Sequence, residues 1–169
     1  MFDIVDLPDE QTLLRVSQRY PQLEISALTT WLALMRTVAD LMADLDHFLA
    51  GHGLAQRRFF VLVLLMRHPD GLKVTELATG TGVSCATMTG VVDRLMRKQL
   101  ITRTASPEDR RAMVVKITEA GLVLLDTVLP EHYRRVTAVM TRLDETQRSA
   151  LQTLLGLIGV PEKEGEELC

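Results

Sequence analysis

One segment of this chain is strongly basic although the chain as a whole is acidic. Residues 84–116 contain seven Lys or Arg and three carboxylates, which leaves a charge of +4, whereas the 169-residue chain carries −3. A basic segment within an acidic chain is the charge distribution expected of a surface that binds nucleic-acid phosphates. The alternative is a solvated charged face with no partner, which charge alone does not exclude.

Residues 85–98 have the periodicity of a helix with one apolar and one polar side. The apolar side is formed by Met88, Val91, Val92 and Leu95. The opposite side is small near its start and cationic near its end, so it could enter a major groove about 12 Å wide. An ordinary amphipathic helix with a solvated outer side is the alternative. The candidate DNA contacts are Ser84, Cys85, Ala86, Thr87, Thr89, Gly90, Arg94 and Arg97.

The chemistry of these side chains suits a duplex. Thr87 and Thr89 could hydrogen-bond phosphates or base edges, and the amides at the helix start attract a phosphate. Arg94 and Arg97 could bind the DNA backbone or a guanine.

A polar loop with two adjacent arginines follows this helix. Residues 100–104 and 113–118 alternate in polarity, as strands do, and the segment between them contains Pro107. The sequence therefore predicts a hairpin whose tip carries Asp109, Arg110 and Arg111. An inserted arginine is attracted to a narrow minor groove, and Asp109 could hold Arg111 in place. The alternative is that these two residues form only an exposed ion pair.

The basic helix is predicted to be the second of two short helices that are joined by a glycine-containing turn. Thr75 is predicted to cap a helix over 75–79, Gly80, Thr81 and Gly82 form the turn, and Ser84 caps the second helix. Residues 72–74 are long enough only for a brief strand. A preceding helix over 54–67 is predicted to be buried largely through Phe59, Phe60, Val63, Leu64 and Met66.

Helices are also predicted on both sides of this region. Residues 26–49 repeat apolar side chains in a heptad pattern, which favours a partner helix along their length. Helices are further expected over 9–20, from Thr118 onward with a kink at Pro130, and after Asp144, which with Gln147 resembles a capping box. The apolar stripes could pack within one subunit or between two. The candidate dimerisation residues are Leu13, Leu14, Leu28, Met42, Leu45, Val136, Met140, Leu151, Leu154, Leu155 and Ile158.

The predicted fold is mainly α with a small β-hairpin (α+β): a winged helix-turn-helix flanked by N- and C-terminal dimerisation helices. The expected divisions are an arm with dimerisation helices over 1–53, a DNA-binding lobe over 54–121, C-terminal dimerisation helices over 122–160 and a tail over 161–169.

Residues 72–121 resemble the DNA-binding core of the MarR family. The resemblance rests on Asp109-Arg110-Arg111 and on the segment Val115-Lys116-Ile117-Thr118-Glu119-Ala120-Gly121, which matches a family pattern of Asp-x-Arg followed by Leu-Thr-x-x-Gly. Outside these 50 residues the chain matches the family only in its helical pattern. Cys85 stands where many members have a basic residue, and Gly90 where many have arginine.

The resemblance implies a homodimer that binds a pseudo-palindromic site in double-stranded DNA, usually as a repressor of nearby genes. It implies that Arg111 enters the minor groove with Asp109 as its anchor, and that residues 84–94 meet the major groove. It also implies release by an oxidant or by a small ligand, often phenolic or lipophilic.

A ligand site is expected between the dimer helices and the DNA-binding lobe, since small molecules bind in apolar clefts with a few polar anchors. The candidates are Trp31, Met35, His47, Arg58, Phe59 and Met66, which could instead be ordinary packing residues. A redox role for Cys85, at a helix start that lowers thiol pKa, is the less favoured alternative to a small filler residue.

Other site classes have little support in the sequence. Cys85 and Cys169 lack disulfide or metal spacing, and the four histidines lack metal-ligand spacing. No cofactor motif or catalytic constellation is recognised, so an enzyme is not expected. The acidic N-terminus is unlike a signal peptide, no apolar run could span a membrane, and the cytoplasm is the predicted location. The alternative function is a winged-helix protein-interaction module without specific DNA binding.

Overall fold

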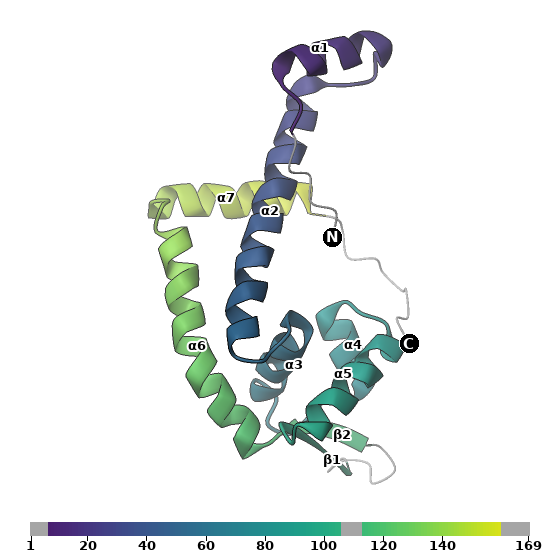
Figure 1. The fold of residues 1–169 in the computed structure, drawn as a ribbon, viewed down its shortest axis with the longest axis vertical. Helices are drawn as coiled ribbons and strands as arrows, with labels where there is room; N and C mark the ends of the chain where they lie inside the picture. Colours follow the sequence, from purple (N-terminus) through teal and green to yellow (C-terminus); the bar gives the residue numbers. More distant parts are fainter. Residues whose placement is uncertain (1–6, 106–112, 160–169) are drawn as a thin grey trace. The chain divides into compact units, whose positions relative to one another are not determined.

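The computed structural model describes residues 7–105 and 113–159, and within them it is mostly helical with one two-stranded antiparallel hairpin, as the sequence predicts (Figure 1). In chain order the elements are α1 (Glu10–Arg19), α2 (Ile25–Gly51), α3 (Gln56–Met66), α4 (Val74–Thr81), α5 (Cys85–Arg97), β1 (Ile101–Ala105), β2 (Met113–Ile117), α6 (Glu119–Met140) and α7 (Glu145–Ile158). The chain divides into two compact units, Met1–Leu54 and Ala55–Cys169. No single described helix is both long and apolar enough to cross a membrane.

The first unit contains α1 and α2, and each begins at a carboxylate cap. Asp9 accepts the Thr12 amide at 2.7 Å, and Glu24 accepts the Ser26 and Ala27 amides. These bonds satisfy amides that have no carbonyl partner in the first helical turn. Asn, Asp, Ser and Thr are the usual caps, so the glutamate at the start of α2 is an atypical choice.

The core of the second unit lies between α3, α4, α5, β2 and α6. Its most buried side chains are Phe59, Val61, Leu62, Leu65, Leu77, Met88, Val92, Leu95, Val115, Leu125 and Val128. The prediction of which side of α3 is buried is partly wrong. Phe60 is 41% exposed, and Val63, Leu64 and Met66 are only half-buried. Val61, Leu62 and Leu65 are buried instead. Since α3 is apolar nearly all round, its sequence could not choose between these sides.

The hairpin pairs Ile101 with Ile117 at one end and Ala105 with Met113 at the other. A third segment joins it through Leu72, whose amide donates to the Val115 carbonyl at 3.0 Å and whose carbonyl accepts the Val115 amide at 2.8 Å. The brief strand predicted over 72–74 is thus a single bridge. It ends there because Lys73 is already the N-cap of α4.

The start of α4 differs from the prediction. Thr75 lies inside the helix, and the side chain of Glu76 reaches back to accept the Lys73 amide at 2.6 Å. The turn is also later than expected, since Gly80 and Thr81 belong to α4. Gly82 is the left-handed residue with φ 66°, a conformation that glycine adopts without steric strain.

The predicted caps of α5, α6 and α7 are confirmed. Ser84 and Thr118 accept amides of the first turns of α5 and α6. Asp144 and Gln147 exchange hydrogen bonds at 2.8 and 2.9 Å in the capping box of α7. Pro130 lies inside α6, which continues from Glu119 to Met140 as one helix.

Candidate nucleic-acid interface

Helix α5 has the two sides that its sequence predicts. Met88, Val91, Val92 and Leu95 are at most 8% exposed, because this side packs against the core of the second unit. The other side is exposed and carries Ala86, Thr89, Gly90, Asp93, Arg94 and Arg97. Tight packing of the apolar side holds the exposed side at the surface as a rigid element. A rigid, small and cationic helix side is suited to lie in the major groove of a duplex.

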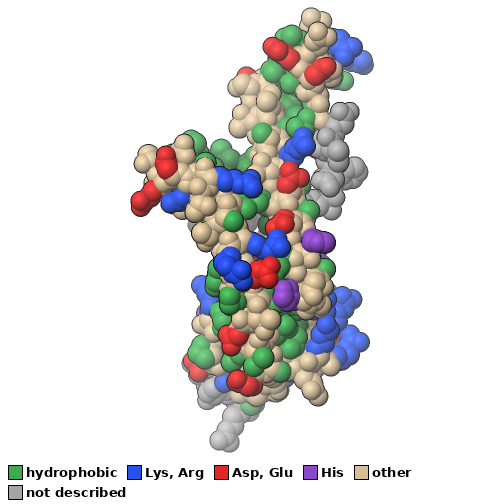
Figure 2. Space-filling view, turned by 60° about the vertical axis from the view of Figure 1, so that its left-hand side comes forward, with side chains coloured by type: hydrophobic (Ala, Val, Ile, Leu, Met, Phe, Trp, Pro, Cys, Tyr) green, Lys and Arg blue, Asp and Glu red, His purple; other side chains and the backbone are tan. Residues whose placement is uncertain are grey.

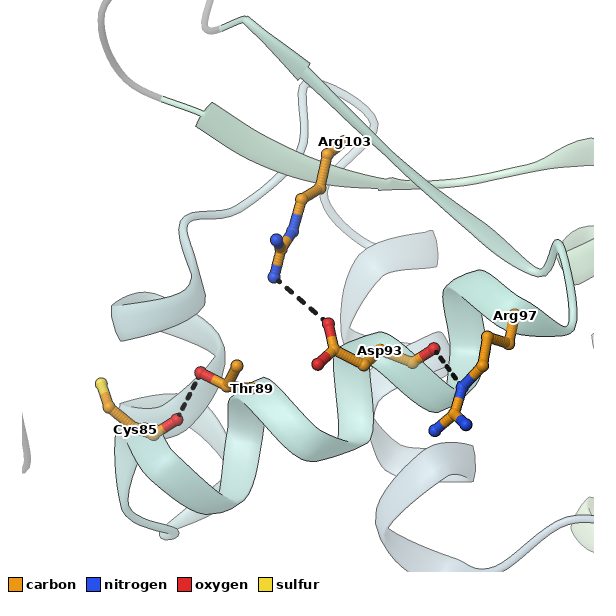
Figure 3. A network of polar contacts seen from close by, with 5 residues as sticks. All are labelled: Cys85, Thr89, Asp93, Arg97 and Arg103. Carbon is orange, nitrogen blue, oxygen red and sulfur yellow. Dashed lines mark hydrogen bonds and ion pairs between the residues drawn. The ribbon is translucent and has the colours of Figure 1, made fainter.

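The first turns of α5 already use some of their hydroxyl hydrogens. Thr89 donates its hydroxyl hydrogen to the Cys85 carbonyl at 2.9 Å (Figure 3). Ser84 donates to Thr87 Oγ1 at 3.0 Å and accepts the Thr87 amide at 3.3 Å. The Thr89 oxygen in this geometry can act only as an acceptor, which suits a donor such as the amino group of adenine or cytosine.

Asp93 joins α5 to the hairpin. Its carboxylate lies 3.8 Å from the guanidinium of Arg103 on β1, and its carbonyl accepts Arg97 Nε at 3.3 Å (Figure 3). The pair is partly exposed, with side-chain exposures of 35% for Arg103 and 54% for Asp93. The acid thereby partly neutralises one cation and holds it against the helix. Arg103 was missed by sequence reasoning, and its place on the outward side of a predicted strand was the available signal.

The hairpin tip, which holds the predicted minor-groove residues, lies outside the described residues. The structure describes β1 up to Ala105 and β2 from Met113. The roles predicted for Asp109, Arg110 and Arg111 therefore stay predictions.

Comparisons with known proteins match this arrangement. The model of the MarR family matches residues 54–113. The HTH-type transcriptional repressor YetL of Bacillus subtilis (strain 168) is 28% identical over 155 residues, covering 91% of this chain and 93% of YetL. The uncharacterized HTH-type transcriptional regulator YpoP of the same organism is 33% identical over 109 residues, covering 63% of this chain and 74% of YpoP. The crystal structure of Sco3205, a MarR family regulator from Streptomyces coelicolor, in complex with DNA aligns with a TM-score of 0.74. It is 25% identical and covers 80% of this chain and 90% of Sco3205.

The chain belongs to the MarR family. It is a DNA-binding transcriptional regulator with a winged helix-turn-helix, and α4 and α5 are the two helices of that motif.

Cys85, the cysteine considered for a redox role, is the first residue of α5 and is half-buried. A redox role is not tested, and the role of Cys85 stays a prediction. Among the residues that the structure describes, no cluster of three His, Cys, Asp or Glu side chains could hold a metal ion.

The residues predicted to bind a ligand lie in different environments. In the first unit, Trp31 is 59% exposed, and Met35 and His47 are also exposed. In the second unit, Arg58 and Met66 are half-buried, whereas Phe59 is 1% exposed and packs edge-on against His132 with ring centroids 5.2 Å apart. Phe59 is therefore a core residue in this structure, which does not favour a role in direct ligand contact.

The apolar stripes predicted to form a dimer are largely uncovered in the single chain. Helix α7 has no buried residue, and Leu154, Leu155 and Ile158 are 41–61% exposed. Met42, Val136, Met140 and Leu151 are between 37% and 44% exposed, Leu14 is 49% exposed, and Leu28 and Leu45 are half-buried. Leu13 differs, because at 7% exposure it is already covered within the chain. Figure 2 shows hydrophobic side chains, drawn green, at the surface of one face of the molecule.

Proposed function

We propose that this regulator is a cytoplasmic repressor without enzymatic activity that binds a pseudo-palindromic operator as a homodimer and is released by a small ligand. The observation that carries the proposal is the exposed side of α5, with its small residues followed by Arg94 and Arg97. In a dimer, two such helices about 34 Å apart would meet successive major grooves on one side of the duplex.

The exposed apolar residues of α1, α2, α6 and α7 support the homodimer. Apolar patches of this kind on a single chain mark interaction surfaces. The proposed divisions are 1–53 and 122–160 for dimerisation, 54–121 for DNA binding and 161–169 as a tail.

The test is binding to duplexes from the DNA upstream of the gene, measured by fluorescence anisotropy at several salt concentrations. We expect one saturable site, protected as two half-sites about 10 base pairs apart, and an affinity that falls steeply with salt. Arg111→Ala should weaken operator binding strongly and leave the dimer intact. Arg142→Ala, a change at an exposed cation just after α6, is the matched control and should bind as the parent protein does.

The alternative function is a protein-interaction module without specific DNA binding. It predicts equal affinity for operator and scrambled duplexes. That result, or affinity that does not depend on salt, would overturn the proposal.

A further inference from the structure

A mostly apolar groove of about 430 Å³ lies in the second unit between α3 and α4. Leu64 and Leu72 are among its apolar lining residues, and His68, Glu76 and Thr79 supply polar groups. Its volume is within the range of small-molecule sites, roughly 300–1,000 Å³. None of the residues predicted from the sequence to bind a ligand lines it.

Gly80 on α4 lies against Leu64 on α3, and both residues line the groove. A Cβ atom at position 80 would lie 2.8 Å from Leu64 Cδ2, closer than side chains pack. Gly80 is inside a helix, where glycine is less favourable than alanine by roughly 1 kcal/mol. The close approach gives a physical reason for glycine here.

Glu76 sets the charge of the groove. It is the one carboxylate among the lining residues that the structure describes, and Lys and Arg are absent from that lining. Its Oε2 atom accepts the Lys73 amide at 2.6 Å, whereas its Oε1 atom has no hydrogen bond within the described part of the chain. An oriented carboxylate with an acceptor to spare, beside an apolar surface, attracts a cation with an apolar body and repels an anion.

We propose that this groove binds a small amine with an aromatic or branched aliphatic body, whose ammonium group pairs with Glu76 while the body lies on Leu64 and Leu72. The site itself does not depend on the proposed function, but its effect on DNA does.

Leu72 connects the groove to two DNA-binding elements, the hairpin and α4. Leu72 lines the groove and is joined to Val115 of β2 by two backbone hydrogen bonds. It also directly precedes Lys73, the N-cap of α4, which Glu76 holds. An occupant that displaces Leu72 or Glu76 therefore acts on the base of the hairpin and on the first helix of the motif together. The expected result is an altered affinity for the operator.

The first experiment needs no DNA. The full chain is titrated with 2-phenylethylamine and with phenylacetate, which have similar apolar bodies and opposite charges, and binding is followed by NMR shifts of the Leu64, Leu72 and Gly80 signals. The amine should bind about tenfold or more tightly than the acid, because the acid meets a like charge. Absence of amine binding, or equal binding of both probes, would overturn the proposed site.

Two variants localise the binding. Glu76→Gln keeps an oxygen that can accept the Lys73 amide, so the start of α4 is retained, and the preference for the amine should disappear. Thr79→Trp should fill the groove and abolish binding of both probes. Asp126→Asn, a change at an exposed carboxylate on α6, is the matched control and should leave the preference as it is. A preference that survives Glu76→Gln would contradict the assignment.

The second experiment measures operator affinity with saturating amine, for the parent protein and for Glu76→Gln. The amine should change the affinity of the parent by at least threefold and that of the variant by less. No change in the parent would overturn the regulatory route. Failure of the chain to bind DNA at all would instead overturn the proposed function, while the titration without DNA would still decide the site.

Discussion

Asp93 on α5 and Arg103 on β1 form an ion pair at 3.8 Å that joins the helix proposed to read DNA to the hairpin beside it. An acid at this position would repel phosphates if it stood alone, and the pair reduces that repulsion. Being partly exposed, the pair is worth at most about 1 kcal/mol to folding. Its larger effect is on where the Arg103 charge is held.

Asp93→Asn should therefore make DNA binding stronger and less selective. The change removes one negative charge and frees Arg103 to contact a phosphate. The dependence of log affinity on log salt should steepen by about one unit, and the ratio of operator to scrambled-duplex affinity should fall. Fluorescence anisotropy with both duplexes over a salt series measures the two quantities. Asp126→Asn is the control for a simple change in net charge, and an equal effect from it would refute a local role for Asp93.

Gly90→Ala should change stability and DNA binding in opposite directions. A Cβ atom at position 90 meets nothing within 4 Å, so the protein's own packing does not require glycine there. Alanine should stabilise α5 by about 0.5–1 kcal/mol. Operator affinity should fall because the added methyl lies on the side of α5 that is proposed to face the major groove of DNA. Urea unfolding and anisotropy test the two effects, and unchanged affinity would show that α5 does not approach DNA at this residue.

Gly121→Ala should destabilise the fold. A Cβ atom at position 121 would overlap the Leu100 carbonyl oxygen and would lie 2.6 Å from Ile117 Cγ1. Overpacking of this kind typically costs about 1–3 kcal/mol, and backbone atoms yield little. Urea unfolding gives the free energy directly. The control is Gly51→Ala, where a Cβ atom meets nothing within 4 Å, and a loss as large there would mean that contact is not the cause.

Leu154→Glu should separate the proposed dimer. Leu154 is 59% exposed on α7, a helix with no buried residue in the single chain, so a charge is tolerated in the monomer but not within an apolar interface. Sedimentation equilibrium over a range of concentrations should show a shift toward the monomer mass. Thr153→Glu introduces the same charge at a neighbouring exposed polar site. If both variants remain dimeric with the stability of the parent protein, the proposal that α7 forms part of the dimer interface is wrong.

The free energy of unfolding should decrease below pH 6.5, partly because His132 is protonated more easily in the unfolded state. Burial lowers the pKa of this imidazole below its usual 6.5, so the folded state binds fewer protons than the unfolded state. The free energy of unfolding is unaffected by protonation of this group above pH 6.5. It decreases as the pH falls through 6.5 toward the pKa of His132 in the folded state. His132→Gln should reduce the difference in the free energy of unfolding between pH 7.5 and pH 5. An unchanged difference would exclude a role for His132.

Local patterns in the sequence were enough to predict several features of the fold. The two sides of α5 follow from residues three and four apart, and the caps at Ser84, Thr118 and Asp144 bond to amides three residues away. These interactions lie within one helical turn, so the chain encodes them wherever the helix is placed. The polarity alternation of the two strands predicted the hairpin because successive side chains of a strand point to opposite faces.

Only the tertiary structure decided which distant residues meet. Arg103 reaches Asp93, Leu72 pairs with Val115, and α3 buries Val61 while exposing Phe60. The groove beside α4 likewise requires Leu64 and Gly80 to be adjacent. A uniformly apolar helix has no preferred side until its neighbours are in place, and a contact across many residues depends on how whole elements pack. That packing is a property of the folded unit, and no local pattern in the sequence specifies it.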